Sequence, residues 1–319
     1  MPCISPVLLF LCKLHSNDAL THAALLFFLN VAHNSSFSMA DKPIVPVPAP
    51  WKLKGTVYTI TFWSRAGELP AFAYSPLEAG SAFADPQISG QHRGGTSQIQ
   101  IIRYTESPVG PYDELILVPG FFDYTVAEGG TIKTQKNARV TRIYVSQKYT
   151  CWNGRKNWNI PKHLAHFEFK DLPDGSTNVK VFPHDTDNDP AETKCSDVPF
   201  FQATVKPMRW APSFPASVSW LKYAGLDVSL VQPPLPEGTG SQGELPGTDK
   251  WCKILPGQDT RKASLAWVDM NQKDEDGTLH AQHENFWPGL GRWQIGVQMD
   301  DCDISFGEGV YWDAPQTKL

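Results

Sequence analysis

The sequence predicts a mainly β protein, closed into a barrel or folded as a sandwich. From residue 50 onward, apolar and polar residues alternate with a period of two, as in strands that bury one face. The 27 prolines and 24 glycines divide the chain into short segments separated by turns. No stretch longer than about ten residues shows a helical apolar stripe, and the one helix candidate is Ala216–Leu221.

Nine segments carry the strand pattern. In Thr56–Phe62 small polar residues alternate with Val, Tyr, Ile and Phe, which are good strand formers. The other eight segments are Gln98–Tyr104, Glu114–Val118, Val140–Ser146, Leu164–Phe169, Asn178–Phe182, Phe201–Val205, Ala263–Asp269 and Arg292–Val297. Three polar or Pro/Gly-rich segments, 184–194, 232–250 and 271–285, are expected to be long loop insertions on this scaffold.

A single β domain over residues 39–319 is expected, because all-β units often reach this size. Residues 1–38 are expected to be a doubtful or disordered N-terminal extension. Their two apolar runs, PVLLFLC and AALLFFL, fall well short of the ~18 residues of a spanning helix, and no basic segment precedes the first. A targeting segment is the alternative. The sequence from residue 39, MADKP, is typical of the N-terminus of a cytosolic protein.

The net charge and the cysteine spacing argue against some classes of partner and indicate a cellular compartment. The net charge is −5, and no block of lysine and arginine is present, which argues against nucleic acid and against an anionic membrane surface. The six cysteines lie far apart without a C-x-x-C pair, so a disulfide framework is not expected. A cytoplasmic, reducing location follows as the prediction.

The sequence contains no complete motif for binding a metal or a nucleotide. The DTDND motif at 185–189 resembles the start of a calcium loop, but Pro190 stands where the turn needs glycine. The H-x-x-H pair at 280–283 lacks a helical context. His163 and His166 would point to opposite faces of a strand. With no G-x-S-x-G and no phosphate loop, we predict no metal and no cofactor.

Lys162, in the segment GRKNWNIPKHLAHFEF, lies in a run that otherwise reads as apolar. An ordinary surface lysine is one interpretation. The other is a buried amine, because burial and a neighbouring cation both lower a lysine pKa from about 10.4 and leave a nucleophile for carbonyl groups. Trp158 could form a dry wall, and Arg155, Lys156 or a protonated His163 could supply the neighbouring cation.

This segment resembles the active-site segment of the acetoacetate decarboxylase family. The matching features are Gly154-Arg155, a gap of five residues, Pro161-Lys162, a basic residue and Leu164. In that family the lysine after the proline forms a Schiff base with a β-keto acid, and the basic residue after it lowers the lysine pKa. The resemblance therefore implies that Lys162 is the nucleophile and that His163 assists it.

A second match is the segment 107–114, SPVGPYDE, which resembles the loop that ends in the family's active-site glutamate. Pro50–Leu53 resembles the family's first strand more loosely. The resemblance implies a conical antiparallel β-barrel and a diverged, fungal-type member of the family. It implies catalytic roles for three residues and substrate-binding roles for three others. The catalytic set is Lys162, Glu114 and His163, and the substrate-binding set is Trp158, Arg155 and Tyr112.

Three departures from the family pattern bear on the substrate. His163 replaces the second lysine, and no arginine lies near Thr56, where the family binds the substrate carboxylate. A further family glutamate would fall near Ile99, which is flanked by Gln98 and Gln100. These changes weaken the case for acetoacetate itself and favour a larger or less acidic ketone, or a site that only binds.

Two functions follow from these residues. The first is a Schiff-base-forming lyase, either a decarboxylase or an aldolase-dehydratase, acting on a β-keto acid or related ketone through Lys162 without a cofactor. The alternative is a non-catalytic small-molecule-binding member of the same fold. Relatives form homo-oligomers, and the sequence leaves this open here. A role outside the family is the remaining hypothesis.

Overall fold

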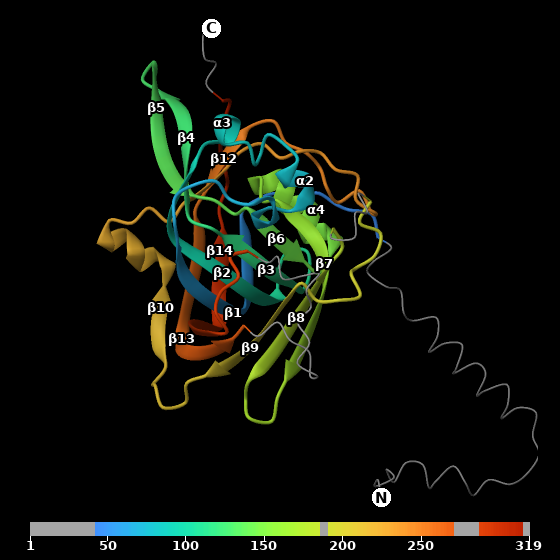
Figure 1. The fold of residues 1–319 in the computed structure, drawn as a ribbon, viewed down its shortest axis with the longest axis vertical. Coiled ribbons are helices and arrows are strands. Elements are labelled where there is room, and N and C mark those ends of the chain that lie inside the picture. Colours follow the sequence, from blue (N-terminus) through green and yellow to red (C-terminus); the bar gives the residue numbers. More distant parts are fainter. Residues whose placement is uncertain (1–41, 186–190, 271–286, 315–319) are drawn as a thin grey trace, which may run out of the picture. The chain divides into compact units, whose positions relative to one another are not determined.

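The computed structural model describes residues 42–185, 191–270 and 287–314, and residues 44–319 form one compact unit (Figure 1). The predicted mainly β class is confirmed. The predicted domain boundary at residues 38 and 39 lies outside the described residues. The ring strands described next are β1 (Trp51–Ser64), β2 (His92–Glu106), β3 (Tyr112–Val118), β6 (Arg142–Val145), β7 (Lys162–Asp171), β8 (Thr177–Pro183), β9 (Phe201–Pro207), β13 (Pro256–Asp269) and β14 (Trp293–Phe306).

Nine strands in the described part of the chain close into a barrel, in the order β1-β14-β13-β9-β8-β7-β6-β3-β2 and back to β1. Each of the nine strands predicted from alternation falls on one strand of this ring. The pairing is antiparallel, as predicted, between every two ring neighbours except β6 and β7, which are parallel. The antiparallel expectation is therefore corrected at this one pair.

The parallel pair exists because a helix connects its strands. Parallel neighbours need a crossover connection, and α4 (Lys148–Trp158) supplies it between β6 and β7. Gln147 caps its first turn by accepting a hydrogen bond from the Tyr149 N–H, and Asn159 ends it in a left-handed conformation (φ 55°). The sequence did not reveal α4, since its buried face consists largely of Thr, Asn, Gly and Arg side chains, which leave no apolar stripe.

The strands missed by sequence lie outside the ring. They are β4 (Phe121–Glu128), β5 (Thr131–Ala138), β10 (Phe214–Ser217), β11 (Leu230–Gln232), β12 (Trp251–Ile254) and β15 (Val310–Trp312). β4 and β5 form a hairpin that projects from the barrel (Figure 1). Most β5 side chains are exposed, so no buried face imposed alternation on the sequence.

The helices beside α4 are short. They are η4 (Ala71–Ala73), α2 (Pro76–Ala79), α3 (Pro86–Ser89) and η5 (Val218–Ala224). The helix expected at Ala216–Leu221 is replaced by the end of β10 and the 3₁₀-helix η5. Within the described residues, no helix combines the length and the apolar character that a membrane crossing requires.

The strands β3, β6 and β7 are buried on both faces, and this arrangement positions the site. All four residues of β6 and the first four of β7 are buried. One face packs in a cluster with α4 that includes Tyr104, Tyr112 and Leu164. The opposite face packs in a second cluster that includes Leu115, Tyr144 and Ala165. Successive residues of β7 therefore enter different environments.

Candidate active site

Lys162 is the first residue of β7, directly after the turn that ends the α4 crossover. The turn is closed around Pro161 by a hydrogen bond of 2.7 Å from the Lys162 N–H to the Ile160 carbonyl. The side chain lies on the face of the sheet that α4 covers and is 4% exposed. The surface-lysine interpretation is therefore wrong, and Lys162 is a buried amine.

Four side chains surround the amine of Lys162, and together with Lys162 they form what we call the polar ring. Lys162 Nζ lies 2.7 Å from Glu114 Oε2 and donates a hydrogen bond of 2.9 Å to Thr150 Oγ1. The Tyr104 hydroxyl donates to Glu114 Oε1 at 2.9 Å. The Tyr112 ring lies under the ammonium, 5.2 Å from Nζ to its centroid, and its hydroxyl hydrogen-bonds with Thr150 and Tyr104. All five side chains are buried.

The electrostatics of this ring keep its phenols protonated. Burial raises the pKa of Tyr104 and of Tyr112 well above 10, and the nearby Glu114 carboxylate raises both further. The ring therefore presents neutral hydroxyl donors beside the Lys162–Glu114 ion pair. Such an arrangement can hold or move a proton at the amine.

Strand register explains why residues far apart in sequence meet here. Tyr104 is paired with Tyr112 across β2 and β3, and Ile102 with Glu114. Glu114 is opposite Val145 on β6, and Lys162 follows one strand further, opposite Ile143. The sequence analysis named Lys162, Glu114 and Tyr112. It missed Tyr104 and Thr150.

A signal for one of the missed residues was present. Tyr104 shares the alternation of the predicted strand Gln98–Tyr104, and a hairpin to Glu114–Val118 brings it next to Tyr112. No pattern identified Thr150, because it projects from the unpredicted helix α4.

Gly154, the glycine of the sequence motif, is the residue of α4 over which the Lys162 side chain passes. A Cβ atom built on Gly154 would lie 2.7 Å from both Cδ and Cε of Lys162. The amine at the end of this chain is fixed by Glu114 and Thr150, so the chain has little freedom to move away. The motif glycine thus provides the space through which the lysine reaches its partners.

We expect Gly154→Ala to lower the free energy of unfolding by about 1–2 kcal/mol, because overpacking outweighs the better helix propensity of alanine. Chemical denaturation measures this change. Lys156→Ala on the same helix is the control, since Lys156 is exposed, and it should change stability by less than about 0.5 kcal/mol. A Gly154→Ala variant as stable as the parent would show that the lysine chain does not pass this position.

His163 points away from Lys162, into a buried cluster of charges. Its Nε2 lies 2.7 Å from Glu78 Oε2 and its Nδ1 lies 2.7 Å from Glu192 Oε1. Burial alone would lower the pKa of His163, but the two carboxylates raise it to about 10. His163 is therefore an imidazolium whose charge is balanced by Glu78 and Glu192. The structure does not bring it against the Lys162 amine.

Arg155 belongs to the same buried cluster. Its Nη1 lies 3.0 Å from Glu78 Oε1 and 3.2 Å from the Lys162 main-chain carbonyl oxygen. Burial alone would raise the pKa of Glu78, but His163 and Arg155 lower it. Arg155 also donates to the carbonyls of Pro236 and Pro246. The loop expected at 232–250 is thus bound to α4.

Trp158, at the end of α4, is part of the apolar packing. Its ring contacts those of Trp51 and Phe306, with centroids 5.2 Å away in each case. Its Nε1 donates to the Gly307 carbonyl at 2.9 Å. Substrate-binding roles for Trp158, Arg155 and Tyr112 stay predictions, and of the three only Tyr112 contacts the amine in these interactions.

Gln98 and Gln100, which flank the position where the resemblance implied a glutamate, carry neutral amides. Gln100 lies in the same cross-strand row as Lys162, connected through Ile116 and Ile143. Its amide accepts a hydrogen bond of 3.0 Å from Gln258 and donates one of 3.1 Å to Gln98. Along the described residues of this row from Lys162 to Gln100, Lys162 is the charged side chain and Gln100 is part of a network of amides.

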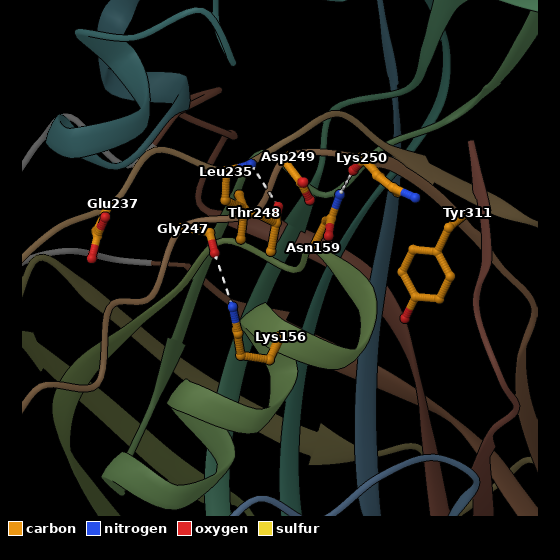
Figure 2. Close-up of a pocket in the computed structure, with 9 residues that line it drawn as sticks. All are labelled: Lys156, Asn159, Leu235, Glu237, Gly247, Thr248, Asp249, Lys250 and Tyr311. Atoms are coloured by element: carbon orange, nitrogen blue, oxygen red, sulfur yellow. Dashed lines mark hydrogen bonds between the residues drawn. The ribbon is translucent and has the colours of Figure 1, made fainter. Parts of the chain in front are cut away.

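A separate groove of about 620 Å³ lies at the C-terminal end of α4 (Figure 2). Its walls come from α4, from the 235–250 loop and from β15, and neither Lys162 nor Glu114 lines it. The residues that line it are Lys156, Asn159, Leu235, Glu237, Gly247, Thr248, Asp249, Lys250 and Tyr311. Asn159 closes part of its wall by donating to the Lys250 carbonyl.

Among the described residues, no group of three or more His, Cys, Asp or Glu side chains is arranged to hold a metal ion. Asp187 and Asp189 of the rejected calcium motif, and the histidines at 280 and 283, lie outside those residues. Within them, His163 is buried and His166 is exposed, as strand alternation predicted.

Fold and site together define a β-barrel protein with a buried lysine–glutamate pair under a crossover helix. No protein-family profile and no curated protein matches the sequence. The chain is similar to the solved acetoacetate decarboxylase of Legionella pneumophila subsp. pneumophila str. Philadelphia 1 (12% identity, TM-score 0.44). That match covers 89% of this chain and 96% of the other.

Two further solved structures have the same kind of similarity. One is described as an acetoacetate decarboxylase (10% identity, TM-score 0.46, 90% of this chain and 98% of the other). The other is an acetoacetate decarboxylase-like enzyme from Sphingomonas wittichii RW1 (9% identity, TM-score 0.44, 88% and 98%).

Proposed function

We propose that the protein is a Schiff-base-forming lyase of the acetoacetate decarboxylase type, acting on a β-keto acid or a related ketone through Lys162. The observation that carries the proposal is the Lys162–Glu114 contact of 2.7 Å in a buried ring of hydroxyl groups. A buried amine beside a carboxylate has both the nucleophile and the proton acceptor that imine formation needs.

The proposed reaction proceeds through an imine on Lys162. Glu114 accepts the ammonium proton, and the free amine of Lys162 adds to the substrate carbonyl to give a carbinolamine. Glu114 returns its proton to the carbinolamine hydroxyl, water leaves, and a protonated imine remains. In a β-keto acid the bond to the carboxylate then breaks, carbon dioxide leaves, and the bonding electrons pass to the iminium to give an enamine. Protonation at carbon and hydrolysis release the ketone and restore the amine.

The other ring members assist these proton movements. Tyr104 holds Glu114 through its hydrogen bond of 2.9 Å, and Thr150 accepts from Lys162 Nζ. The face of the Tyr112 ring lies beside the amine, where its negative quadrupole favours a cationic iminium. Aldol and dehydration reactions use the same imine. The neutral Gln98–Gln100 pair supports a ketone less acidic than acetoacetate.

A non-catalytic small-molecule-binding protein is the second candidate. The observation that favours it is that the amine already has three partners within the protein, namely Glu114, Thr150 and the Tyr112 ring. A lysine retained only for structure would have these contacts as well. The fungal-type membership, the cytoplasmic location and the absence of nucleic-acid and membrane partners stay predictions.

Borohydride trapping distinguishes the two candidates. The protein is incubated with a panel of β-keto acids and larger ketones, reduced, and analysed by intact mass and peptide mapping. We expect a covalent adduct on the peptide that contains Lys162, and carbon dioxide release will identify a decarboxylase. Lys162→Met should lose the adduct entirely.

The control is Lys156→Met, an exposed lysine on α4, which should retain the adduct. Circular dichroism establishes that each variant is folded. A folded parent protein that gives no adduct with any carbonyl compound contradicts the lyase and leaves the binding protein. An adduct that maps to another lysine contradicts the role of Lys162.

A further inference from the structure

Glu78 connects two cations that lie beside the main chain of Lys162. Its Oε1 is 3.0 Å from Arg155 Nη1, and its Oε2 is 2.7 Å from His163 Nε2. Glu78 belongs to α2, Arg155 to α4 and His163 to β7, so one carboxylate joins three elements that are far apart in sequence. All three side chains are completely buried, and hydrogen bonds between charged groups are the strong ones in proteins.

These contacts form a closed loop around the peptide bond between Lys162 and His163, which we call the Glu78 clamp. Arg155 Nη1 also donates a hydrogen bond of 3.2 Å to the Lys162 carbonyl oxygen, and Cys151 Sγ donates to the same oxygen at 3.2 Å. The loop starts at Glu78, passes through Arg155 to that oxygen, and returns through the His163 side chain. Because the peptide unit is planar, holding its oxygen and the next side chain fixes its orientation.

The orientation of this peptide unit determines where the lysine side chain runs. The Lys162 side chain passes Gly154, where not even a methyl group would fit, and ends between Glu114 and Thr150. A rotation of the main chain at its base would move the amine away from these partners. A displacement of about 1 Å at a reacting group can lower a rate roughly a hundredfold.

The charges of the clamp balance one another. Arg155 and His163 each carry one positive charge, and the carboxylates of Glu78 and Glu192 carry one negative charge each. These four groups therefore lack the net positive charge that would favour a free amine at Lys162. What the clamp supplies to the amine is its position.

We propose that Glu78 is a positioning residue for Lys162, and that it acts through Arg155 and the Lys162 main chain. The inference rests on the proposed imine chemistry at Lys162. It also gives a role to the basic residue that follows the lysine, because the His163 side chain holds the peptide unit without contacting the amine.

The matched comparison is Glu78→Gln against Glu192→Gln. Each substitution removes one buried carboxylate from His163 and changes the charge by the same amount. Of the two glutamates, Glu78 is the one that contacts Arg155. A loss of stability or of charge balance should therefore appear in both variants, whereas loss of the clamp should appear in Glu78→Gln.

The measurement is the rate of trapping in excess borohydride against the concentration of a ketone or β-keto acid that labels the parent. For Glu78→Gln we expect the limiting rate to fall about 10–100-fold, with the half-saturating concentration within about twofold of the parent value. Glu192→Gln should keep the limiting rate within about threefold of the parent rate. Circular dichroism and thermal melting establish that each variant is folded.

Glu78→Asp keeps the proposal testable if Glu78→Gln does not fold. It preserves the charge, but its side chain is one methylene shorter and cannot hold Arg155 and His163 together. We expect its limiting rate to fall at least about tenfold, an effect that charge alone would not produce.

A double-mutant cycle tests the clamp without relying on the chemistry. If Glu78 positions the amine, Glu78→Gln also loosens the Lys162–Glu114 ion pair, so Glu114→Gln should destabilise this variant less than it destabilises the parent. Denaturant unfolding should show a shortfall from additivity of about tenfold or more in the unfolding equilibrium constant. Glu192→Gln and Glu114→Gln should be additive.

Folded Glu78→Gln and Glu78→Asp proteins that trap at the parent rate overturn the proposal, as does an equal loss of rate in Glu192→Gln. Additive losses for Glu78→Gln and Glu114→Gln overturn it as well. A parent protein that forms no adduct contradicts the proposed lyase instead, and the double-mutant cycle then decides whether the clamp positions the amine.

Discussion

Replacing Glu114 with glutamine will lower the free energy of unfolding by about 3–5 kcal/mol, because the Lys162 ammonium is left buried without its counter-charge. The amine and the carboxylate are 2.7 Å apart, and both side chains are almost completely shielded from water. A neutral amide can accept one hydrogen bond, but it cannot balance the charge. Denaturant unfolding at neutral pH measures the loss.

The same substitution will also abolish borohydride trapping, since no base remains within reach of the ammonium proton. Adding Lys162→Met to Glu114→Gln removes both charges and should recover most of the lost stability, because apolar groups commonly replace a buried ion pair without net cost. This double-mutant cycle isolates the pair from the rest of the site.

An exposed ion pair provides the control. Glu128 and Lys133 are 3.0 Å apart with more than half of each side chain exposed, so Glu128→Gln should cost less than about 1 kcal/mol. If Glu114→Gln costs no more than this exposed control, Lys162 and Glu114 do not form a buried pair in solution.

Stability will fall as the pH rises from 6.5 toward 10, because folding holds a proton on His163. In the folded protein Glu78 and Glu192 raise the pKa of His163 from 6.5 to about 10. The native state therefore binds the proton more tightly than the unfolded chain. The resulting stability is fully present below pH 6.5 and is lost through pH 10, an effect on the order of 5 kcal/mol.

His163→Gln removes this titration. We expect the variant to be less stable than the parent at pH 6, with the difference shrinking as the pH approaches 10. Comparing the two proteins by denaturant unfolding at each pH cancels the contributions of tyrosines and lysines that titrate in the same range. His166→Gln is the control, since His166 is exposed on the same strand, and at pH 6 it should change stability far less than His163→Gln does. A His163→Gln difference that is constant with pH contradicts the imidazolium assignment.

The sequence predicted the ring strands well because each of them has at least one buried face in the barrel. When one face of a strand is buried, apolar and polar residues alternate along it. Thr56–Phe62 in β1 is an example. The polar hairpin strand β5 and the helix α4 were missed for the opposite reason. The exposed side chains of β5 need no alternation, and the buried face of α4 satisfies Thr150, Asn153 and Arg155 by specific contacts rather than by apolar burial.

For the site, local sequence was enough to identify Lys162 and Glu114, because each lies in a short motif with recognisable spacing. It misjudged the neighbour of the lysine. His163 follows Lys162 directly, and proximity in sequence suggested that it acts on the amine. In a strand, adjacent side chains point to opposite faces, so His163 meets Glu78 and Glu192 instead.

By itself, the sequence determined the fold class, the nine strands of the ring and the two residues at the centre of the site, because these features depend on local periodicity and local motifs. The tertiary structure alone decided that Tyr104 and Thr150 complete the ring around the amine. It also decided that His163 belongs to a different charge cluster. The physical reason is that hydrogen bonds and ion pairs depend on distances of about 3 Å between side chains, and only strand register and the α4 crossover set those distances.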